Sequence, residues 1–574
     1  MGLQEWRRLD CRRAEKNILA ARDNISNQIA QSDLELAKIN NSLGCLYLDM
    51  GKYESAYDFL NSALAAFQPA YDANNIEVRA VMFSIAQYDY YTGNFERARK
   101  TAQDIIDNSN TKTDKVVITS ISHFIAMIYD SLGKYDSAIS MYKDVLSLYD
   151  DIAEDKELSK NLADYANDPH LSQDEKEDKT NAVKWIILTY NNMGQVYTHL
   201  KKYDSACSAL QTGLSISLDN IYIGRENLTA SKLYMNLAVA DANLGNIKEA
   251  LDNIDLAMRI QKKLFNYEGS YPGLVEVYNT YATLLMKNND YANAKNYLKK
   301  EIELAKTTFG ENHPLTAEAY NTFSIYWYKC GNYEKAASSA EKAITIRKNI
   351  LGKNHLTTAA VYQNLSDCYN NMGKFEKSIT NAQEAVIICE AIYGKHNINT
   401  AQAYTTLVWP YANMGKIKNA ENRIKLALDI CNKQANTANE TVAYIYQTAG
   451  YVYMRKRNFT TAEQYLKQAQ TLFSNLSKEI SVNTAEIYRY LGDICMEKSN
   501  YQNASDYYQN AWSIYQQVFQ NDDSYESRFG SQIKNLYKNL KPKESYENWL
   551  KKWKSESRLT FDSSRTREHV RDYY

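Results

Sequence analysis

The chain repeats one order of apolar and polar residues, most clearly in the two consecutive stretches Thr316–Gly352 and Thr358–Gly394. Aligned on Gly331 and Gly373, the two stretches lie 42 residues apart. In both, the positions eleven, eight, seven and four residues before this glycine are apolar or small, and this i, i+3, i+4, i+7 spacing marks one face of an α-helix. Each stretch therefore predicts a first helix that ends near the glycine and a second helix that follows it.

The same pattern occurs eleven times, with steps of 40 to 44 residues and one step of 68. Five residues after the aligned position stands alanine in ten of the eleven copies, and Ser378 in the other. A small residue that recurs at one place predicts two helices that approach too closely for a larger side chain. The aligned positions, called turn residues below, are Gly51, Gly93, Gly133, Lys201, Gly245, Asn289, Gly331, Gly373, Gly415, Arg457 and Ser499. A period of this length is typical of an all-α array of helical hairpins.

The period also divides the chain. Ala14 lies 42 residues before Ala56, so the chain begins within a repeat, either as a degenerate cap or as a piece of something longer. The long step contains an acidic stretch that predicts a solvated insertion, with an acidic docking loop as the alternative. We expect a half repeat or cap at 1–30, repeats one to three at 31–150, the insertion at 151–180, repeats four to eleven at 181–519, capping helices at 520–554 and a polar tail at 555–574.

Composition narrows the classes of partner. The net charge of -1 disfavours nucleic acid and anionic lipid as partners. No run of about 18 apolar residues is present, which disfavours a membrane span. The eight cysteines are scattered without paired spacing, as expected for buried thiols in a reducing compartment. The sequence therefore predicts a soluble, cytoplasmic protein.

Catalytic and metal-binding motifs are absent from the sequence, including the phosphate-binding, dinucleotide-binding and zinc-protease motifs. His313, His355 and His396 recur between repeats, but equivalent positions in neighbouring hairpins are about 10 Å apart, too far to share a zinc ion. We interpret these histidines as loop and helix-cap residues. The chain is expected to be no enzyme and to hold neither cofactor nor metal.

The turn pattern G-x-Y-x-x-A resembles the tetratricopeptide repeat. The inter-repeat phrases FGENHPLTA, LGKNHLTTA and YGKHNINTA resemble the longer 42-residue repeats of kinesin light chains and their bacterial relatives. This resemblance covers about residues 9 to 519 and implies a right-handed α-solenoid of about eleven hairpins plus terminal capping helices. It also implies that the first helices line a concave groove, in which the position nine residues before the turn contacts bound peptide.

The candidate groove residues lie thirteen, nine and six residues before the turn, where the apolar stripe leaves the first helix free. Most are amides, hydroxyls or charged groups, which suit the N–H and C=O groups of an extended peptide. Alternatively, they only solvate the groove or keep adjacent first helices in register. They are Asn192, Gln195, Lys232, Asn236, Glu276, Thr280, Glu318, Thr322, Asn364, Asp367, Gln402, Thr406, Trp409, Thr448 and Tyr451.

These patterns favour a non-catalytic scaffold or adaptor that binds an extended peptide or a helix of a partner protein. The chain is expected to be a monomer or part of a partner-dependent complex. An alternative is the sensor or inhibitory arm of a larger effector such as a protease or kinase, as the bacterial relatives suggest. A self-assembling structural rod is a third hypothesis.

Overall fold

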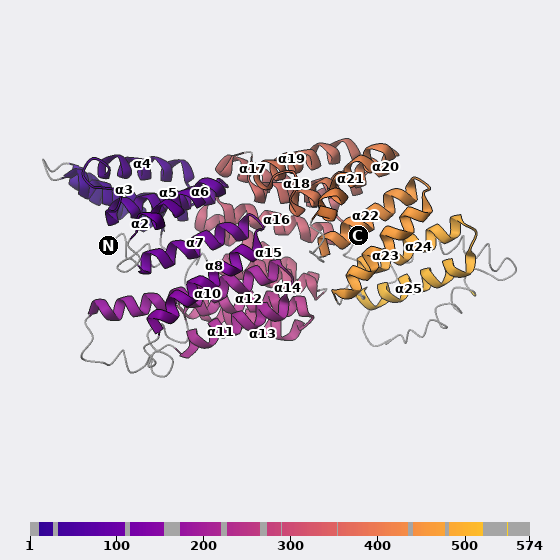
Figure 1. Cartoon of the computed structure of the whole chain (residues 1–574), viewed down its shortest axis with the longest axis horizontal. Helices are drawn as coiled ribbons and strands as arrows, with labels where there is room; N and C mark the ends of the chain where they lie inside the picture. The colour runs from indigo at the N-terminus through magenta and orange to yellow at the C-terminus, as the bar shows by residue number, and fades with distance from the viewer. Residues whose placement is uncertain are drawn as a thin grey trace. The chain divides into compact units, whose positions relative to one another are not determined.

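The computed structural model describes residues 11–26, 32–109, 115–153, 173–219, 227–264, 273–288, 290–352, 354–433, 440–476, 481–519 and 548. Within these ranges every regular element is a helix, and the helices form eleven consecutive hairpins after α2 (Cys11–Ser26) (Figure 1). The prediction of an all-α array of hairpins is therefore confirmed. The expected capping helices at 520–554, the tail at 555–574 and most of the acidic insertion lie outside the described residues.

The hairpins have first helices of 15 to 27 residues. These first helices are α3 (Ser32–Asp49), α5 (Ile76–Tyr91), α7 (Lys115–Ser131), α10 (Gln173–His199), α12 (Leu228–Leu244), α14 (Gly273–Lys287), α16 (Pro314–Lys329), α18 (Leu356–Asn371), α20 (Ile398–Asn413), α22 (Glu440–Arg455) and α24 (Val482–Glu497). The second helices are α4 (Tyr53–Phe67), α6 (Phe95–Asp107), α8 (Tyr135–Ala153), α11 (Tyr203–Asp219), α13 (Ile247–Leu264), α15 (Tyr291–Phe309), α17 (Tyr333–Leu351), α19 (Phe375–Tyr393), α21 (Ile417–Lys433), α23 (Phe459–Asn475) and α25 (Tyr501–Phe519).

The turn inside each hairpin explains the glycine that marks the repeat. In the first hairpin the Lys52 amide donates to the Tyr47 carbonyl at 2.8 Å, and the Gly51 amide donates to the Leu48 carbonyl at 3.0 Å. This pair of bonds is the Schellman motif, which needs a left-handed backbone at the turn residue. Gly51 has a φ of 65°, and glycine adopts this conformation without steric cost. In every hairpin the second helix begins two residues later, at the aromatic residue or isoleucine of the pattern.

The small residues of the pattern lie where the two helices of a hairpin touch. Ala56 and its equivalents are fully buried. A Cβ atom on Gly44 would lie 2.4 Å from Leu60, and one on Gly450 would lie 2.5 Å from Leu466. Real Cβ contacts do not come this close, so a larger residue would push the two helices apart. The prediction of closely packed helices is correct.

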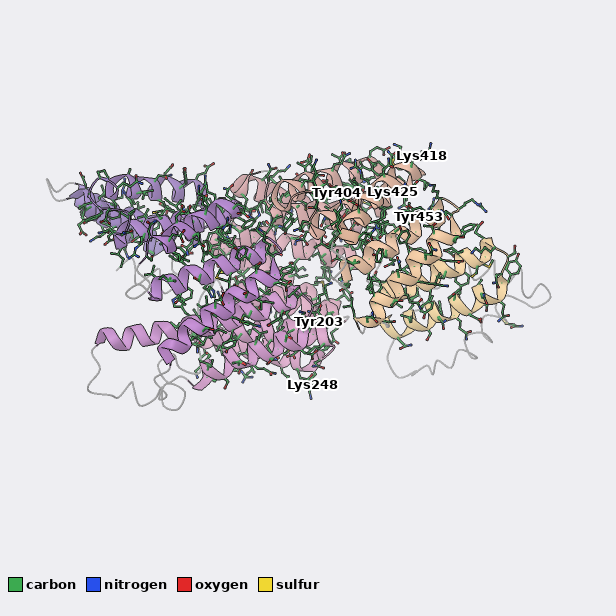
Figure 2. The ribbon with its side chains drawn as sticks, viewed as in Figure 1. Tyr203, Lys248, Tyr404, Lys418, Lys425 and Tyr453 are labelled. Carbon is green, nitrogen blue, oxygen red and sulfur yellow. The ribbon has the colours of Figure 1, made fainter. Side chains whose placement is uncertain are left out.

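Tyrosine occupies the position eleven residues before the turn in each of the last eight repeats, and these tyrosines form a stripe along the first helices. Tyr404, labelled in Figure 2, is 4% exposed, and its hydroxyl donates to Glu390 Oε1 at 2.6 Å. Tyr320 and Tyr362 are also buried, while the other tyrosines of the stripe are half-buried. The stripe therefore contributes to packing within and beside each hairpin.

The described helices belong to two compact units. Unit 1 comprises Met1–Tyr326 and Ser338–Val361, and unit 2 comprises Trp327–Ala337 and Tyr362–Tyr574. In unit 1 the first helix α10 contacts α12, which contacts α14, and in unit 2 α20 contacts α22, which contacts α24. Side chains that face along a row of first helices therefore meet their counterparts in the next hairpin.

Unit 1 also contains a contact between hairpins that are far apart in the sequence. The turn residue Gly51 lies against Pro314 and His313, and a Cβ atom there would be 2.6 Å from Pro314 Cδ. One repeat later, the turn residue Gly93 lies against His355, with its Cβ position 3.1 Å from His355 Cδ2. Two loops one repeat apart thus pack onto two turns one repeat apart.

The histidines in these loops have a definite structural role. His313 Nδ1 accepts from the Leu315 amide at 3.1 Å, and His355 Nδ1 accepts from the Thr357 amide at 3.2 Å, so each ring caps the start of a first helix. Their rings are 4% and 8% exposed, and burial lowers the pKa of each to about 4. The interpretation as helix-cap residues is correct for these two, whereas His396 is exposed.

None of the helices described by the structure is long and apolar enough to cross a membrane.

Candidate functional site

Three of the candidate groove residues of unit 1 form a hydrogen-bonded amide ladder with Asn191. Gln195 Nε2 donates to Asn236 Oδ1 at 3.4 Å, and Asn236 Nδ2 donates to Asn191 Oδ1 at 2.8 Å. Asn191 Nδ2 donates in turn to Asn192 Oδ1 at 3.1 Å. These amides link α10 to α12 and satisfy one another. In this part of unit 1 the contacts agree with the alternative expectation, in which these residues keep adjacent first helices in register.

His123 on α7 extends the ladder, although sequence reasoning assigned it no role. Its Nε2 lies 2.9 Å from Asn192 Nδ2, and its Nδ1 lies 3.0 Å from Thr189 Oγ1. Burial lowers the pKa of His123 to about 4, so the ring is neutral at pH 7 and can accept a hydrogen bond at one nitrogen while donating at the other. His123 lies ten residues before the turn residue Gly133, outside the positions expected to line the groove.

Thr322 and Glu318 on α16 also have partners inside unit 1. Thr322 is 5% exposed and accepts from Asn279 Nδ2 at 2.7 Å. Glu318 forms an ion pair with Arg347, whose side chain is only 4% exposed. Thr322 is therefore closed to a partner protein, because its side chain already packs against α14. Thr280 is half-buried, and Lys232 and Glu276 are exposed.

In unit 2 the structure brings Trp409 and Tyr451 together. Their rings stack with centroids 4.8 Å apart, and the Tyr451 ring lies 5.3 Å from that of Tyr490 on the next first helix. Trp409 Nε1 donates to the Tyr444 hydroxyl at 3.0 Å. The four rings, called the aromatic cluster below, come from α20, α22 and α24. Offset stacking of this kind adds about 0.5–1.5 kcal/mol per pair beyond the burial of area.

The members of the aromatic cluster differ in access to solvent. Trp409 and Tyr444 are half-buried, whereas Tyr451 is 8% exposed and Tyr490 is 4% exposed. The Tyr451 hydroxyl accepts from Arg455 at 2.9 Å and donates to Asn413 Oδ1 at 3.3 Å. Tyr451 therefore belongs to the buried part of the cluster, and Trp409 and Tyr444 form its accessible part.

Asp367 lies on α18, which is joined to α20 of the cluster by a hydrogen bond from Asn413 Nδ2 to Asn370 Oδ1 at 3.0 Å. Burial, and to a lesser extent the Asp367 carboxylate, raises the pKa of Tyr328 and of Tyr444. The side-chain amide of Asn371 donates to the Asp367 backbone carbonyl at 2.9 Å. Burial raises the pKa of Asp367 to about 7. Within the described part of the chain, its carboxylate has no hydrogen-bond donor and no ion-pair partner.

The remaining candidates of unit 2 range from buried to exposed. Thr448 is fully buried and donates to the Tyr444 carbonyl at 2.9 Å, so it is closed to a partner protein. Gln402 is exposed, and Asn364 and Thr406 are half-buried. Tyr444 and Tyr490 were absent from the expected set because polar side chains were sought at their positions. Among the described residues no group of three or more histidine, cysteine or acidic side chains is arranged to hold a metal ion.

Comparison with known proteins agrees with the helical hairpins. Family models described as the tetratricopeptide repeat match residues 35–111, 273–349, 324–386 and 363–433, and a second such model matches 120–152, 188–220 and 443–475. A SHNi-TPR model matches residues 485–522. No curated protein matches the chain.

Several solved structures match the chain at low sequence identity. The TPR-like repeats of a Podosopora anserina kinesin light chain are 17% identical, cover 36% of this chain and 98% of their own, and give a TM-score of 0.32. The apo form of RapI is 15% identical, covers 71% and 99%, and gives 0.44. A Rap protein complexed with Competence and Sporulation Factor is 11% identical, covers 78% and 99%, and gives 0.43.

Arrays of this repeat generally serve as non-catalytic scaffolds that bind protein or peptide partners. The repeat models together match more than half of the chain, and in ten of the hairpins the structure describes both backbone hydrogen bonds of the turn. The chain belongs to the tetratricopeptide-repeat family.

Proposed function

We propose that the protein is a non-catalytic scaffold of the cytoplasm that holds a segment of a partner protein on the first helices of unit 2. The observation that carries this proposal is the aromatic cluster, in which Trp409 and Tyr444 remain accessible. The adjacent first helix α18 carries Asp367, a carboxylate without a counter-ion among the described residues. Accessible aromatic side chains that pack against buried residues of their own chain are common anchors of protein interfaces. Neighbouring Gln402 and Thr406 supply polar groups for a peptide backbone.

The first helices of unit 1 are the weaker candidate for this role. Their amides are largely engaged with one another, so a peptide would have to replace existing hydrogen bonds. Lys232, Glu276 and Thr280 are the remaining candidates there, and we assign them a secondary part in binding.

Selection from a library of random peptides displayed on phage tests the proposed function. The full-length chain is the bait, and each selected peptide is measured again with Trp409→Ala. Since truncation of an anchor costs at least about 2 kcal/mol, we expect binding to weaken by about 30-fold or more. Ile387→Ala is the matched control, because Ile387 is an apolar residue of unit 2 that is 56% exposed on the second helix α19.

Equal binding by wild type and a folded Trp409→Ala variant would contradict the proposal. The alternative role is a sensor or inhibitory arm of a protease or kinase. In that role, binding of a peptide to the same surface would change the activity of an associated enzyme. A bound peptide that leaves every co-purifying enzyme unchanged would count against that alternative and leave the scaffold function intact.

A further inference from the structure

The unpaired carboxylate of Asp367 identifies what the bound segment must provide. Asp367 is half-buried, so its carboxylate has lost part of its hydration, yet no cation among the described residues compensates for this loss. An unpaired charge in such a place destabilises the free protein. Arrival of a cationic or strongly donating group would remove this cost.

The cations on the neighbouring first helices are engaged elsewhere or do not pair with Asp367. Arg455 on α22 donates to the Tyr451 hydroxyl, and its guanidinium lies 5.8 Å from the Tyr451 ring centroid. Arg489 on α24 is held by Glu486 and Asp493. Lys329 on α16 forms no ion pair with Asp367. The carboxylate is therefore open to a cation from outside the described chain.

The groups around Asp367 suit a cation as well. The Tyr328 hydroxyl accepts from Asn371 Nδ2 at 3.1 Å, and the Tyr444 hydroxyl accepts from Trp409 Nε1 at 3.0 Å. Both phenol oxygens retain a second lone pair. Asn371 Nδ2, which donates to the Tyr328 hydroxyl, also donates to the Asp367 backbone carbonyl at 2.9 Å. On the other side of α18, Asn413 Nδ2 of α20 donates to Asn370 Oδ1 at 3.0 Å, so α18 adjoins the helix that carries Trp409. The faces of Trp409 and neighbouring rings attract a cation through their quadrupole.

We propose that Asp367, the hydroxyls of Tyr328 and Tyr444 and the indole of Trp409 form a pocket for a lysine or arginine side chain of the bound protein segment. This inference rests on the proposed function, since it names the chemistry that the same surface recognises. A metal ion is the less suitable occupant, because a hard cation such as Ca²⁺ takes six or more oxygen ligands and the pocket offers one carboxylate. A lysine or arginine side chain needs only one carboxylate and adds an aliphatic stem that packs on Trp409.

The peptide library provides the test. Peptides selected on wild-type protein should be enriched in lysine or arginine at one position, and replacing that residue by norleucine or citrulline should weaken binding by about 10-fold or more, as expected for a hydrogen bond between charged groups. Asp367→Asn preserves shape and removes the charge, so it should abolish the preference for the basic residue. Glu376→Gln is the matched control, because Glu376 is an exposed acid of α19 in the same unit.

The outcomes separate this inference from the proposed function. Selected peptides that bind through Trp409 but show no basic preference, or that bind Asp367→Asn as tightly as wild type, would overturn the lysine or arginine pocket and leave the scaffold standing. A selection that yields no Trp409-dependent peptide would overturn both. Loss of binding by Asp367→Asn to all peptides, basic or not, would show a structural role for Asp367 and contradict the inference.

Discussion

Asn279 on α14 donates from one amide nitrogen to both Thr322 Oγ1, at 2.7 Å, and Glu301 Oε1, at 2.8 Å. Thr322 was expected to line an accessible groove, where its replacement would change stability by only about 0.5 kcal/mol in either direction. Its burial and its hydrogen bond change that expectation. Part of the row of first helices in unit 1 is therefore a buried contact between neighbouring helices and not an accessible surface.

Thr322→Ala should therefore destabilise unit 1 by about 1–2 kcal/mol, because a buried hydrogen bond is lost and a small cavity is left. The measurement is hydrogen exchange of the amides of α14 and of α16, in which protection should fall by about 5- to 30-fold. Thr280→Ala is the control, since Thr280 is half-buried in α14 and has no side-chain hydrogen bond in the described chain. Equal effects of the two substitutions would contradict the assigned role of Thr322.

Glu301 should make the stability of unit 1 fall as the pH rises. Burial raises its pKa to about 8, and its Oε2 has no partner among the described residues. A raised pKa in the folded state means that the native chain binds the proton more tightly than the unfolded chain. The resulting stabilisation is full below the ordinary pKa near 4.5 and is lost as the pH rises through about 8.

Thermal unfolding between pH 6 and pH 9 checks this dependence. Glu301→Gln retains an acceptor for Asn279 and cannot ionise, so its melting temperature should fall less than that of wild type over this range. The two curves should differ most at pH 9. Parallel curves would mean that Glu301 is already ionised in the fold.

The turn residues that are not glycine should be sites of strain. Lys201, Arg457 and Ser499 have φ values of 59°, 63° and 59°. A side chain in this conformation costs about 1–2 kcal/mol, whereas glycine avoids that cost but loses more entropy on folding. Ser499→Gly should therefore raise stability by about 0.5–1 kcal/mol.

The reverse change provides the control for this prediction. Gly373 has a φ of 70°, and a Cβ atom there would meet nothing within 4 Å, so Gly373→Ser tests backbone conformation without a clash. It should lower stability by a similar amount in thermal unfolding. If both changes shift the melting temperature in the same direction, backbone strain does not govern these turns.

The contact between distant hairpins of unit 1 should depend on His313 and His355. Removing both rings eliminates two helix caps and the packing against the turns at Gly51 and Gly93. We expect the double alanine variant to speed hydrogen exchange in those turns, far along the sequence from the substitutions. His396→Ala is the control, because His396 is exposed.

The same contact should weaken in acid. Burial holds the pKa of both rings near 4, below the ordinary value of 6.5, so the neutral form is the one that the fold favours. The stabilisation is present above about pH 6.5 and is lost as the pH falls toward 4. Exchange rates in the turns at Gly51 and Gly93 that stay constant from pH 7 to pH 4, after correction for intrinsic exchange, would contradict this assignment.

Local features of the fold could be predicted from the sequence because they repeat. The turn glycine, the aromatic residue two positions later and the buried alanine each act within one hairpin, so a single period exposes them. The docking of His313 on Gly51 could not be predicted, since it joins distant repeats and depends on how the hairpins stack. For the same reason the pattern could not show that Thr322 and Thr448 are buried while Trp409 stays accessible.

The candidate site could be predicted only in outline. Trp409 and Tyr451 share the position six residues before the turn, and their rings stack across neighbouring hairpins. Tyr444 belongs to the row thirteen residues before the turn, and only the hydrogen bond from Trp409 joins it to the cluster. The amides of unit 1 looked equally suitable for peptide binding, but their mutual hydrogen bonds depend on side-chain directions that the spacing does not specify.

Hydrogen exchange of the full-length chain, with and without a selected peptide, locates the surface that holds the partner. We expect added protection in the first helices α18, α20 and α22, around Asp367, Trp409 and Tyr444, with little change in the second helices α19 and α21. Trp409→Ala should remove this protection at the same peptide concentration, whereas Ile387→Ala should leave it unchanged. Protection confined to α19 and α21, or to unit 1, would contradict the claim that the first helices of unit 2 hold the partner.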